Sequence, residues 1–109
     1  MNGYGEWRPA GEGIRRKIYP PGNSIMSMAI EFEAGARGAA HSHPHEQITH
    51  VIEGRLRLTV DGASHELGPG EQLFVPGGAV HSAEALKASS VLEIFSPLRD
   101  DLLASVEGR

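Results

Sequence analysis

The chain is built of short apolar runs separated by turn residues, and one run shows the pattern most clearly. In residues 24–33, every second position from residue 26 to residue 32 is apolar, and the positions between those four are small or polar. A period of two over this length is typical of a β-strand with one buried face. The face that we expect to be buried carries four large side chains: Met26, Met28, Ile30 and Phe32.

Shorter runs of the same kind follow along the chain. We predict strands over residues 13–19, 47–54, 55–62, 64–67, 72–76, 79–86 and 90–97. Asp61-Gly62 is a hairpin signal, and the other breaks are also rich in glycine and proline. We expect residues 1–12 to be irregular and residues 33–40 to form a loop. Turns recurring about every 8–12 residues favour a sandwich, jelly roll or small barrel.

Only the tail, residues 97–109, has helical character. Its apolar side chains recur at helical spacing and form one face: Leu98, Leu102, Leu103 and Val106. The pattern as a whole therefore predicts an all-β fold with a short C-terminal helix.

Length and composition narrow the possible functions. A chain of 109 residues predicts a single domain, residues 1–109. The net charge is −4 and the ten basic residues are scattered, so we expect no nucleic-acid partner. There is no cysteine, which excludes disulfides and cysteine-bound zinc. The first residues lack signal-peptide features and no apolar run is long enough to span a bilayer, so we expect a cytoplasmic protein without a membrane partner.

The segment HSHPHEQ contains three of the six histidines. Side chains two residues apart on a strand point the same way, so His41 and His43 share a face, joined by Gln47 if the strand resumes after the proline. With His81 they would offer three imidazole nitrogens and one amide oxygen. This donor set suits a divalent transition metal such as Ni, Zn, Fe, Mn or Co. The alternative is that exposed histidines cluster here by chance.

The remaining polar residues of this region fit the site less well. Glu46 and His50 have the wrong parity for the same face, and His45 lies in the turn. We expect these residues to surround the site or lie on the surface. Glu46 is a substitute ligand if the strand register slips by one residue.

Gln47 affects the charge of the proposed site. A glutamate ligand would offset part of a metal's +2 charge, but glutamine is neutral. The uncancelled charge in a barrel of low dielectric attracts an anion, which favours acidic small molecules as substrates. It argues mildly against a site tuned for oxygen activation.

The predicted last strand places a carboxylate among core residues. Val91, Glu93 and Phe95 share one face, and an ionised carboxylate is rarely buried without a partner or a role. Arg99 follows closely and could grip a substrate carboxylate with both arms of its guanidinium. The alternative is a structural ion pair between Glu93 and Arg99, and the residues alone leave both open.

Two motifs resemble those of the cupin family. The first covers residues 35–54 and the second residues 70–81, with the glycines and histidines at the expected spacing. Gln47 stands where the first motif usually has glutamate, and Ala85 where the second is often followed by asparagine. The resemblance implies a double-stranded β-helix, a jelly-roll barrel, that holds a metal in its mouth. Cupins commonly dimerise, so we also expect a homodimer.

Nearly the whole chain is similar to KdgF-like cupins. Four segments carry the resemblance: EGIRRKI (12–18), HSHPHEQ (41–47), VPGGAVH (75–81) and EIFSPLRDD (93–101). Proteins of this kind convert 4,5-unsaturated uronates, the products of polysaccharide lyases, to linear ketonized sugars. The resemblance therefore implies an acidic sugar as substrate and a metal-dependent isomerase activity in pectin or other uronate catabolism.

The KdgF-like resemblance also implies roles for individual residues. The metal ligands correspond to His41, His43, Gln47 and His81. Residues important for activity correspond to Glu93, Phe95 and Arg99, although the family's acid is typically aspartate, one methylene shorter than Glu93. Three alternatives stay open at this stage: a metal-dependent dioxygenase or other oxidoreductase, a non-catalytic sugar-binding module, and a cupin without activity.

Overall fold

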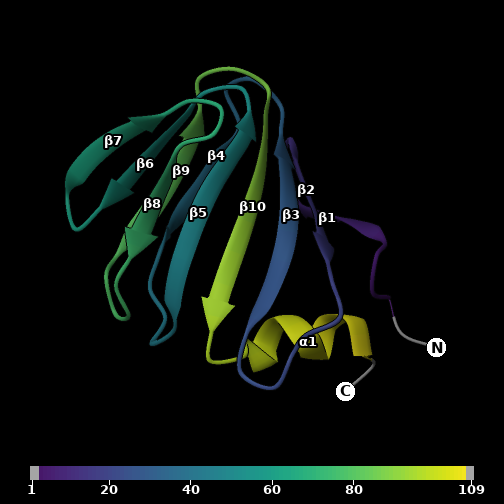
Figure 1. Ribbon diagram of the computed structural model, residues 1–109. Helices are drawn as coiled ribbons and strands as arrows, with labels where there is room; N and C mark the ends of the chain where they lie inside the picture. Colours follow the sequence, from purple (N-terminus) through teal and green to yellow (C-terminus); the bar gives the residue numbers. More distant parts are fainter. Residues whose placement is uncertain (1–2, 108–109) are drawn as a thin grey trace.

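The computed structural model describes residues 3–107, and within that range it contains ten β-strands and one α-helix (Figure 1). The strands are β1 (Trp7–Gly11), β2 (Ile14–Ile18), β3 (Met26–Phe32), β4 (Arg37–His41), β5 (Glu46–Glu53), β6 (Leu56–Val60), β7 (Ala63–Leu67), β8 (Gln72–Val75), β9 (His81–Ala85) and β10 (Ser89–Ser96). The helix α1 spans Asp100–Glu107.

The strands form two antiparallel sheets. One has six strands in the order β1-β2-β3-β10-β5-β8, and the other has four in the order β4-β9-β6-β7. Consecutive strands cross between sheets several times, as in a jelly roll. The buried apolar side chains come from both sheets, and the largest fully buried ones include Phe95, Leu56 and Val51. This arrangement confirms the all-β expectation.

The inner face of the six-stranded sheet is mostly apolar because alternate residues of its strands point into the core. On β3 the inward residues are the four predicted from the sequence, all less than 9% exposed. The register places Glu93 of β10 directly opposite Met28 and Thr49 on its two neighbours. It also places Arg16 of β2 opposite Ile30. Two charged side chains thus interrupt an otherwise apolar wall.

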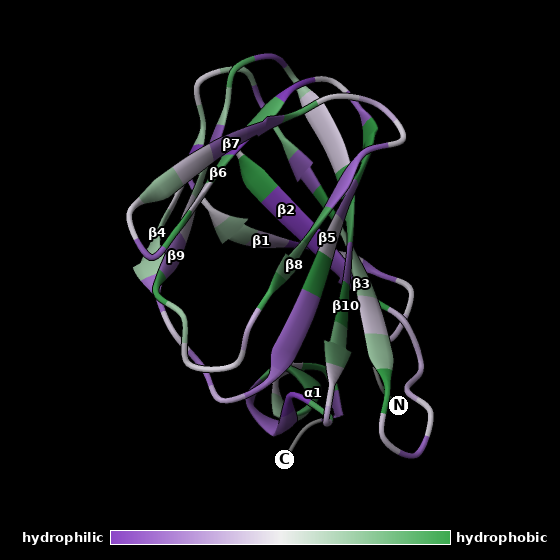
Figure 2. Cartoon of the chain, turned by 60° about the vertical axis from the view of Figure 1, so that its left-hand side comes forward, coloured by the Kyte–Doolittle hydropathy of each residue, from purple (hydrophilic) through white to green (hydrophobic). Residues whose placement is uncertain are grey.

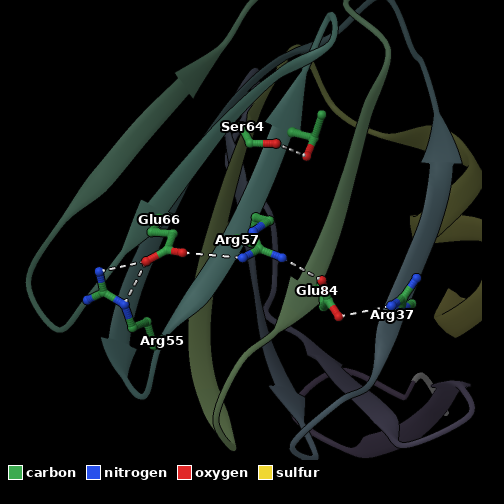
Figure 3. Close-up of polar contacts among 7 residues, drawn as sticks. Arg37, Arg55, Arg57, Ser64, Glu66 and Glu84 are labelled. Carbon is green, nitrogen blue, oxygen red and sulfur yellow. Dashed lines mark hydrogen bonds and ion pairs between the residues drawn. The ribbon is translucent and has the colours of Figure 1, made fainter.

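The outer face of the four-stranded sheet carries a ladder of ion pairs (Figure 3). Glu66 bonds Arg55 at 2.9 Å and Arg57 at 3.3 Å, and Glu84 bonds Arg57 at 3.0 Å and Arg37 at 3.1 Å. These pairs join β4, β9, β6 and β7 in register. Because these pairs are partly exposed, each contributes little to stability, and together they show which side of this sheet faces solvent.

The helix α1 lies across one end of the two sheets (Figures 1 and 2). Leu102, Leu103 and Val106 are buried against the core, as the helical spacing of the tail predicted. The N-terminal segment holds the helix from outside, because the Gly3 amide donates to the carbonyl of Val106 at 2.7 Å. Within the range that the structure describes, no helix is long and apolar enough to cross a membrane.

Two segments expected to be irregular are strands. Residues 7–11 form β1, which pairs with β2 and contains a register shift between Pro9 and Gly11. Trp7 of β1 lies under the cations of Arg15 and Lys17, at 4.4 and 4.7 Å from the ring centroid. These tertiary contacts hold a segment whose own sequence is a poor strand former.

The second correction concerns residues 33–40, expected to be a loop. Residues 37–41 form β4, which pairs with β9. Glycine and alanine dominate this strand, so it has no alternation of large apolar and polar residues to reveal it. Pairing to β9 in the four-stranded sheet orders it.

Candidate metal centre and adjoining cavity

Three histidines from different elements meet at one end of the barrel. His41 ends β4, His81 begins β9 directly opposite it, and His43 lies in the turn that leads to β5. One ring nitrogen from each lies within 4.8 Å of those of the other two. His41 is exposed, whereas His43 and His81 are buried. The histidines predicted to converge therefore do so, and they form a triad able to hold a metal ion.

The way the chain brings them together differs from the expectation. β4 ends at His41, so His43 projects from a turn and not from the same strand. The turn after β8 shapes this loop: the amide of Gly78 donates to the carbonyl of His43 at 2.8 Å. A Cβ on Gly77 would lie only 2.4 Å from the carbonyl oxygen of Pro44. The turn at Gly77 and Gly78, in the second motif, thus holds in place the loop of the first motif that carries His43.

Backbone carbonyls fix the tautomer of all three rings. Each Nδ1 lies near the carbonyl oxygen of a residue two positions away. The distance is 2.9 Å from His41 to Ala39, 3.1 Å from His43 to His45, and 2.9 Å from His81 to Ala79. An Nδ1–H that donates to a carbonyl leaves Nε2 with a free lone pair. Burial also lowers the pKa of His43 and His81, aided at His43 by the charge of Arg99, so neutral rings are favoured.

The donor set suits a divalent metal. The Nε2 of His81 is buried and has no hydrogen-bond partner among the described residues, and His81 belongs to the group whose ring nitrogens lie within 4.8 Å of one another. The Oε1 of Gln47 lies 3.1 Å from Nε2 of His43, and its amide nitrogen donates to Thr49 at 2.9 Å, which orients the oxygen toward the histidine. Two acceptors facing each other and an unpartnered buried nitrogen fit a shared cation.

The other polar residues of this segment lie outside the triad. Glu46 is exposed, since the register of β5 points Gln47 inward. The ring of His50 bonds Gln72 at 3.0 Å on the exposed side of the sheet. His45 donates from Nε2 to the carbonyl of Leu98 at 3.1 Å, linking the histidine loop to the segment before α1.

A cavity of about 350 Å³ lies between the sheets beside the triad. Its polar lining includes His41, His81, Gln47, Glu93, Arg99 and Arg16, and the remaining walls are mainly apolar or small. A larger hollow of about 720 Å³ lies around Trp7 and Arg15, but none of the triad lines it. The smaller cavity is thus the one that combines room for a small molecule with chemically active groups.

Glu93 faces this cavity from the middle of β10. Burial raises the pKa of Glu93 to about 7, and the positive charge of Arg99 opposes that rise. A carboxyl group with a pKa near 7 can both give and accept a proton at neutral pH. Glu93 therefore lies inward, as predicted, and its pKa suits it to transfer protons at neutral pH.

The guanidinium of Arg99 is held from one side. Its Nε and Nη2 donate to the two carboxylate oxygens of Asp101 at 3.0 and 2.8 Å, and this pairing lowers the pKa of Asp101 to about 2. The guanidinium also lies 5.0 Å from the ring centroid of Phe95. Phe95 in turn meets the ring of His43 edge-on at 5.7 Å. Arg99 pairs with Asp101, and residues 3–107 contain no ion pair between Arg99 and Glu93.

Sequence reasoning missed Arg16. It lies on the inner face of β2 and lines the cavity, yet its guanidinium makes no ion pair or hydrogen bond with another described residue. The alternation of Ile14, Arg16 and Ile18, with Ile18 only 1% exposed, was the available signal. It shows that an arginine shares the buried face of the predicted strand.

Comparison with known proteins agrees with this geometry. The sequence model of the Cupin domain family matches residues 28–95. The "Pectin degradation protein KdgF" of Dickeya dadantii (strain 3937) is 33% identical over 99 residues, covering 89% of this chain and 90% of that protein. The structure of KdgF from Halomonas sp. has a TM-score of 0.85 at 36% identity, covering 90% of this chain and 91% of that one.

Two further relatives widen the comparison. An RmlC-like cupin from Shewanella frigidimarina has a TM-score of 0.84 at 33% identity, covering 89% of this chain and 87% of that one. The "Dimethylsulfoniopropionate lyase DddW" of Ruegeria pomeroyi is 32% identical over 84 residues, which is 75% of this chain and 53% of the lyase.

Proposed function

The chain belongs to the cupin family and is KdgF-like, and from that premise we propose that it opens the ring of 4,5-unsaturated uronates to give linear ketonized sugars. The observation that carries the proposal is Glu93, a carboxyl group with a pKa of about 7 in the cavity beside the histidine triad. The name of the Dickeya relative, a pectin degradation protein, agrees with a uronate substrate.

The proposed metal ligands are His41, His43, Gln47 and His81. A divalent transition metal bound there would supply positive charge and Lewis acidity. Because Gln47 is neutral, no protein carboxylate in this ligand set offsets that charge. With Arg99 near the triad, this end of the cavity favours an acidic ligand and stabilises negative charge that develops on it.

Glu93 is the proposed proton carrier. In a cyclic unsaturated uronate the C1 hydroxyl loses its proton, the bond between C1 and the ring oxygen breaks, and C1 becomes an aldehyde. The freed oxygen stays on C5 as an enolate, which becomes a ketone when C4 accepts a proton. Glu93 takes the first proton and supplies the second, so the reaction is an isomerisation without oxidant or reductant.

Phe95 and Arg99 complete the proposed catalytic group. Phe95 is 1% exposed and packs against both the ring of His43 and the guanidinium of Arg99. It keeps water away from the faces of His43 and Arg99 that it covers, beside the cavity. The charge of Arg99 stabilises anionic species in the cavity and limits the rise in the pKa of Glu93.

The test uses purified protein loaded in turn with Ni, Zn, Fe, Mn or Co. Monomeric 4,5-unsaturated galacturonate absorbs in the ultraviolet, and ring opening followed by ketonization removes that absorbance. We expect loss of absorbance with wild-type protein, and at least a hundredfold slower loss with Glu93→Gln at unchanged metal content. A Glu93→Gln variant with the full rate would contradict the role of Glu93, and an inert wild-type protein with every metal would contradict the function.

Parallel measurements separate the other activities. A dioxygenase would consume oxygen during the reaction, whereas the proposed isomerisation does not. A binding module would bind the uronate without changing its absorbance. The similarity to the dimethylsulfoniopropionate lyase, 53% of which is matched, supports a second candidate, so dimethylsulfoniopropionate should be offered as an alternative substrate.

Two expectations about the state of the protein belong to the same proposal. We propose a homodimer, which light scattering of the purified chain would detect by its mass. We also propose that it acts in the cytoplasm, which fractionation of cells that express it would test.

A further inference from the structure

We propose that Arg16 is the residue that grips the carboxylate of the substrate and so makes the cavity specific for acidic sugars. The inference deepens the proposed function and rests on it for the identity of the substrate. It gives Arg16 the bidentate contact that the sequence suggested for Arg99.

The strand register places Arg16 within reach of the cavity and apart from Glu93. Arg16 lies opposite Ile30, and Ile30 lies opposite Val91, whereas Glu93 belongs to the next inward row with Met28. Two strand spacings and one row separate the two residues, about 12 Å between Cα atoms. Both line the same cavity, Arg16 from β2 and Glu93 from β10.

The charge of Arg16 has no counterpart among the residues that the structure describes. Glu93 is the only acidic residue among the described residues that line the cavity. The cation that opposes the rise in the pKa of Glu93 is Arg99. On the same strand Arg15 points outward and pairs with Glu31, yet the half-buried Arg16 is left without such a partner. A guanidinium withdrawn from water without a partner is costly, and a bound carboxylate would satisfy it.

The two cavity arginines thus differ in what they can offer. The Nε and Nη2 of Arg99 already bond Asp101, and this is the pair of donors that forms the side-on grip on a carboxylate. Arg16 retains all five N–H groups for a ligand.

The position of Arg16 also orients the sugar. A uronate ring held at β2 by its carboxylate extends between the sheets toward Glu93 and the histidine triad. The small residues of the facing wall, Gly38, Ala39 and Ala83, leave room for the ring. A neutral sugar of the same size would fit this space but would leave the guanidinium unsatisfied, which is the basis of discrimination.

The test compares Arg16→Gln with Arg15→Gln in the metal-loaded protein. Both variants remove one positive charge from the same strand, but only Arg16 faces the cavity. Equilibrium binding of D-galacturonate and of D-galactose is measured by calorimetry, and turnover of unsaturated galacturonate by absorbance. We expect Arg16→Gln to weaken galacturonate binding about tenfold or more, to raise KM by a similar factor, and to leave galactose binding unchanged.

The control and the outcomes separate this inference from the proposed function. Arg15→Gln should bind both sugars, and turn over unsaturated galacturonate, as the wild type does. Arg16→Lys keeps the charge but loses the two-donor guanidinium, so it should recover only part of the affinity for galacturonate. Its melting temperature shows whether the fold is intact. Galacturonate binding unaffected by Arg16→Gln would overturn the inference even if turnover proceeds. Binding that depends on Arg16 in a protein without turnover would support the inference and contradict the proposed function.

Discussion

At the scale of single residues, the backbone determines which atoms of the histidine triad are available to a ligand. Nδ1 of His41, His43 and His81 faces a carbonyl oxygen two residues away in each case, so the same nitrogen is occupied in all three rings. The Nε2 atoms are left to meet at one point. The site therefore depends on short loops whose carbonyls are correctly placed. Small changes in those loops should lower the affinity for a metal.

Gly77→Ala tests that dependence. The added methyl carbon would lie 2.4 Å from the carbonyl oxygen of Pro44, which is backbone and cannot rotate away. The loop that carries His43 must then shift, and we expect metal affinity to fall about tenfold or more because ligand orientation is lost. We also expect the free energy of unfolding to fall by about 1–3 kcal/mol. Metal titration followed by calorimetry and chemical denaturation would measure the two effects.

Gly38→Ala provides the matched control for this substitution. It adds the same methyl group, but the nearest neighbour of the new Cβ is the Cβ of Ala83 at an ordinary 4.0 Å. Metal affinity should stay within about twofold of the wild type. Equal losses in the two variants would show that the Gly77 contact does not position the histidine loop.

Glu93 gives the protein a stability that depends on pH. Its pKa is raised from 4.5 to about 7 in the folded state, so the folded protein favours the protonated carboxyl. The resulting stability is complete below about pH 4.5 and is lost as the pH rises through about 7. We predict that the melting temperature of wild-type protein, relative to Glu93→Gln, falls by roughly 5 °C or more between pH 5 and pH 8.

The measurement is made with a chelator present, so that no metal charge alters the titration. The shifts at His43 and His81 have the opposite sign, because their pKa values are lowered, and the difference between the two variants removes their contribution. A difference in melting temperature that stays constant across this pH range would mean that Glu93 titrates as an ordinary surface carboxyl.

At the scale of elements, α1 is a lid on one end of the barrel and the support for Arg99. The amides of Leu102 and Leu103 both donate to the carbonyl of Arg99 at 3.0 Å, so the first turn of the helix begins at that residue. Asp100 and Asp101 in this turn are favourably placed toward the positive end of the helix dipole. A loosened helix would therefore disturb Arg99 as well as the core.

Leu103→Ala tests how much the lid contributes. Leu103 is 1% exposed, and its truncation leaves a cavity, so we expect a loss of about 2–5 kcal/mol in the free energy of unfolding. Ile25→Ala removes an apolar group of the same size from a residue that is 56% exposed, and it should cost less than about 1 kcal/mol. Urea denaturation of both variants would give the values. Equal losses would mean that α1 packs only loosely on the barrel.

Strands with a buried face could be predicted from the sequence, and those held only by their neighbours could not. β3 alternates strictly and all four of its predicted inward residues are buried. The interior of β4 is only glycine and alanine, and β1 contains both proline and glycine, so neither carries a periodic signal. Their order comes from pairing with β9 and β2, contacts that a local pattern does not contain.

The candidate site could be predicted to a similar extent. Motif spacing located the histidines, although His43 reaches the site from a turn instead of a strand. The pairing of Arg99 with Asp101, two residues away, and the inward position of Arg16 depend on side-chain rotamers and sheet register. Both the free and the paired state of an arginine are compatible with the same sequence, so only the structure distinguishes them.

At the scale of the whole molecule, the histidine site joins the two sheets. His41 and His81 come from β4 and β9 of the four-stranded sheet, and Gln47 comes from β5 of the six-stranded sheet. His43 lies in the turn that connects β4 with β5. A cation held by this group would therefore cross-link the sheets at the end of the cavity, and binding should stabilise the entire fold instead of one loop.

Metal addition should raise the melting temperature of chelator-treated protein. A ligand that binds only the folded state at about 100 times its dissociation constant adds about 2.7 kcal/mol of stability. For a domain of this size that corresponds to a rise of roughly 10 °C, which differential scanning fluorimetry would detect. His81→Ala should abolish the rise because it removes a buried donor, whereas His65→Ala, an exposed histidine on β7, should keep it. If His81→Ala retained the full rise, the cation would be bound elsewhere and the two sheets would be held by their apolar core alone.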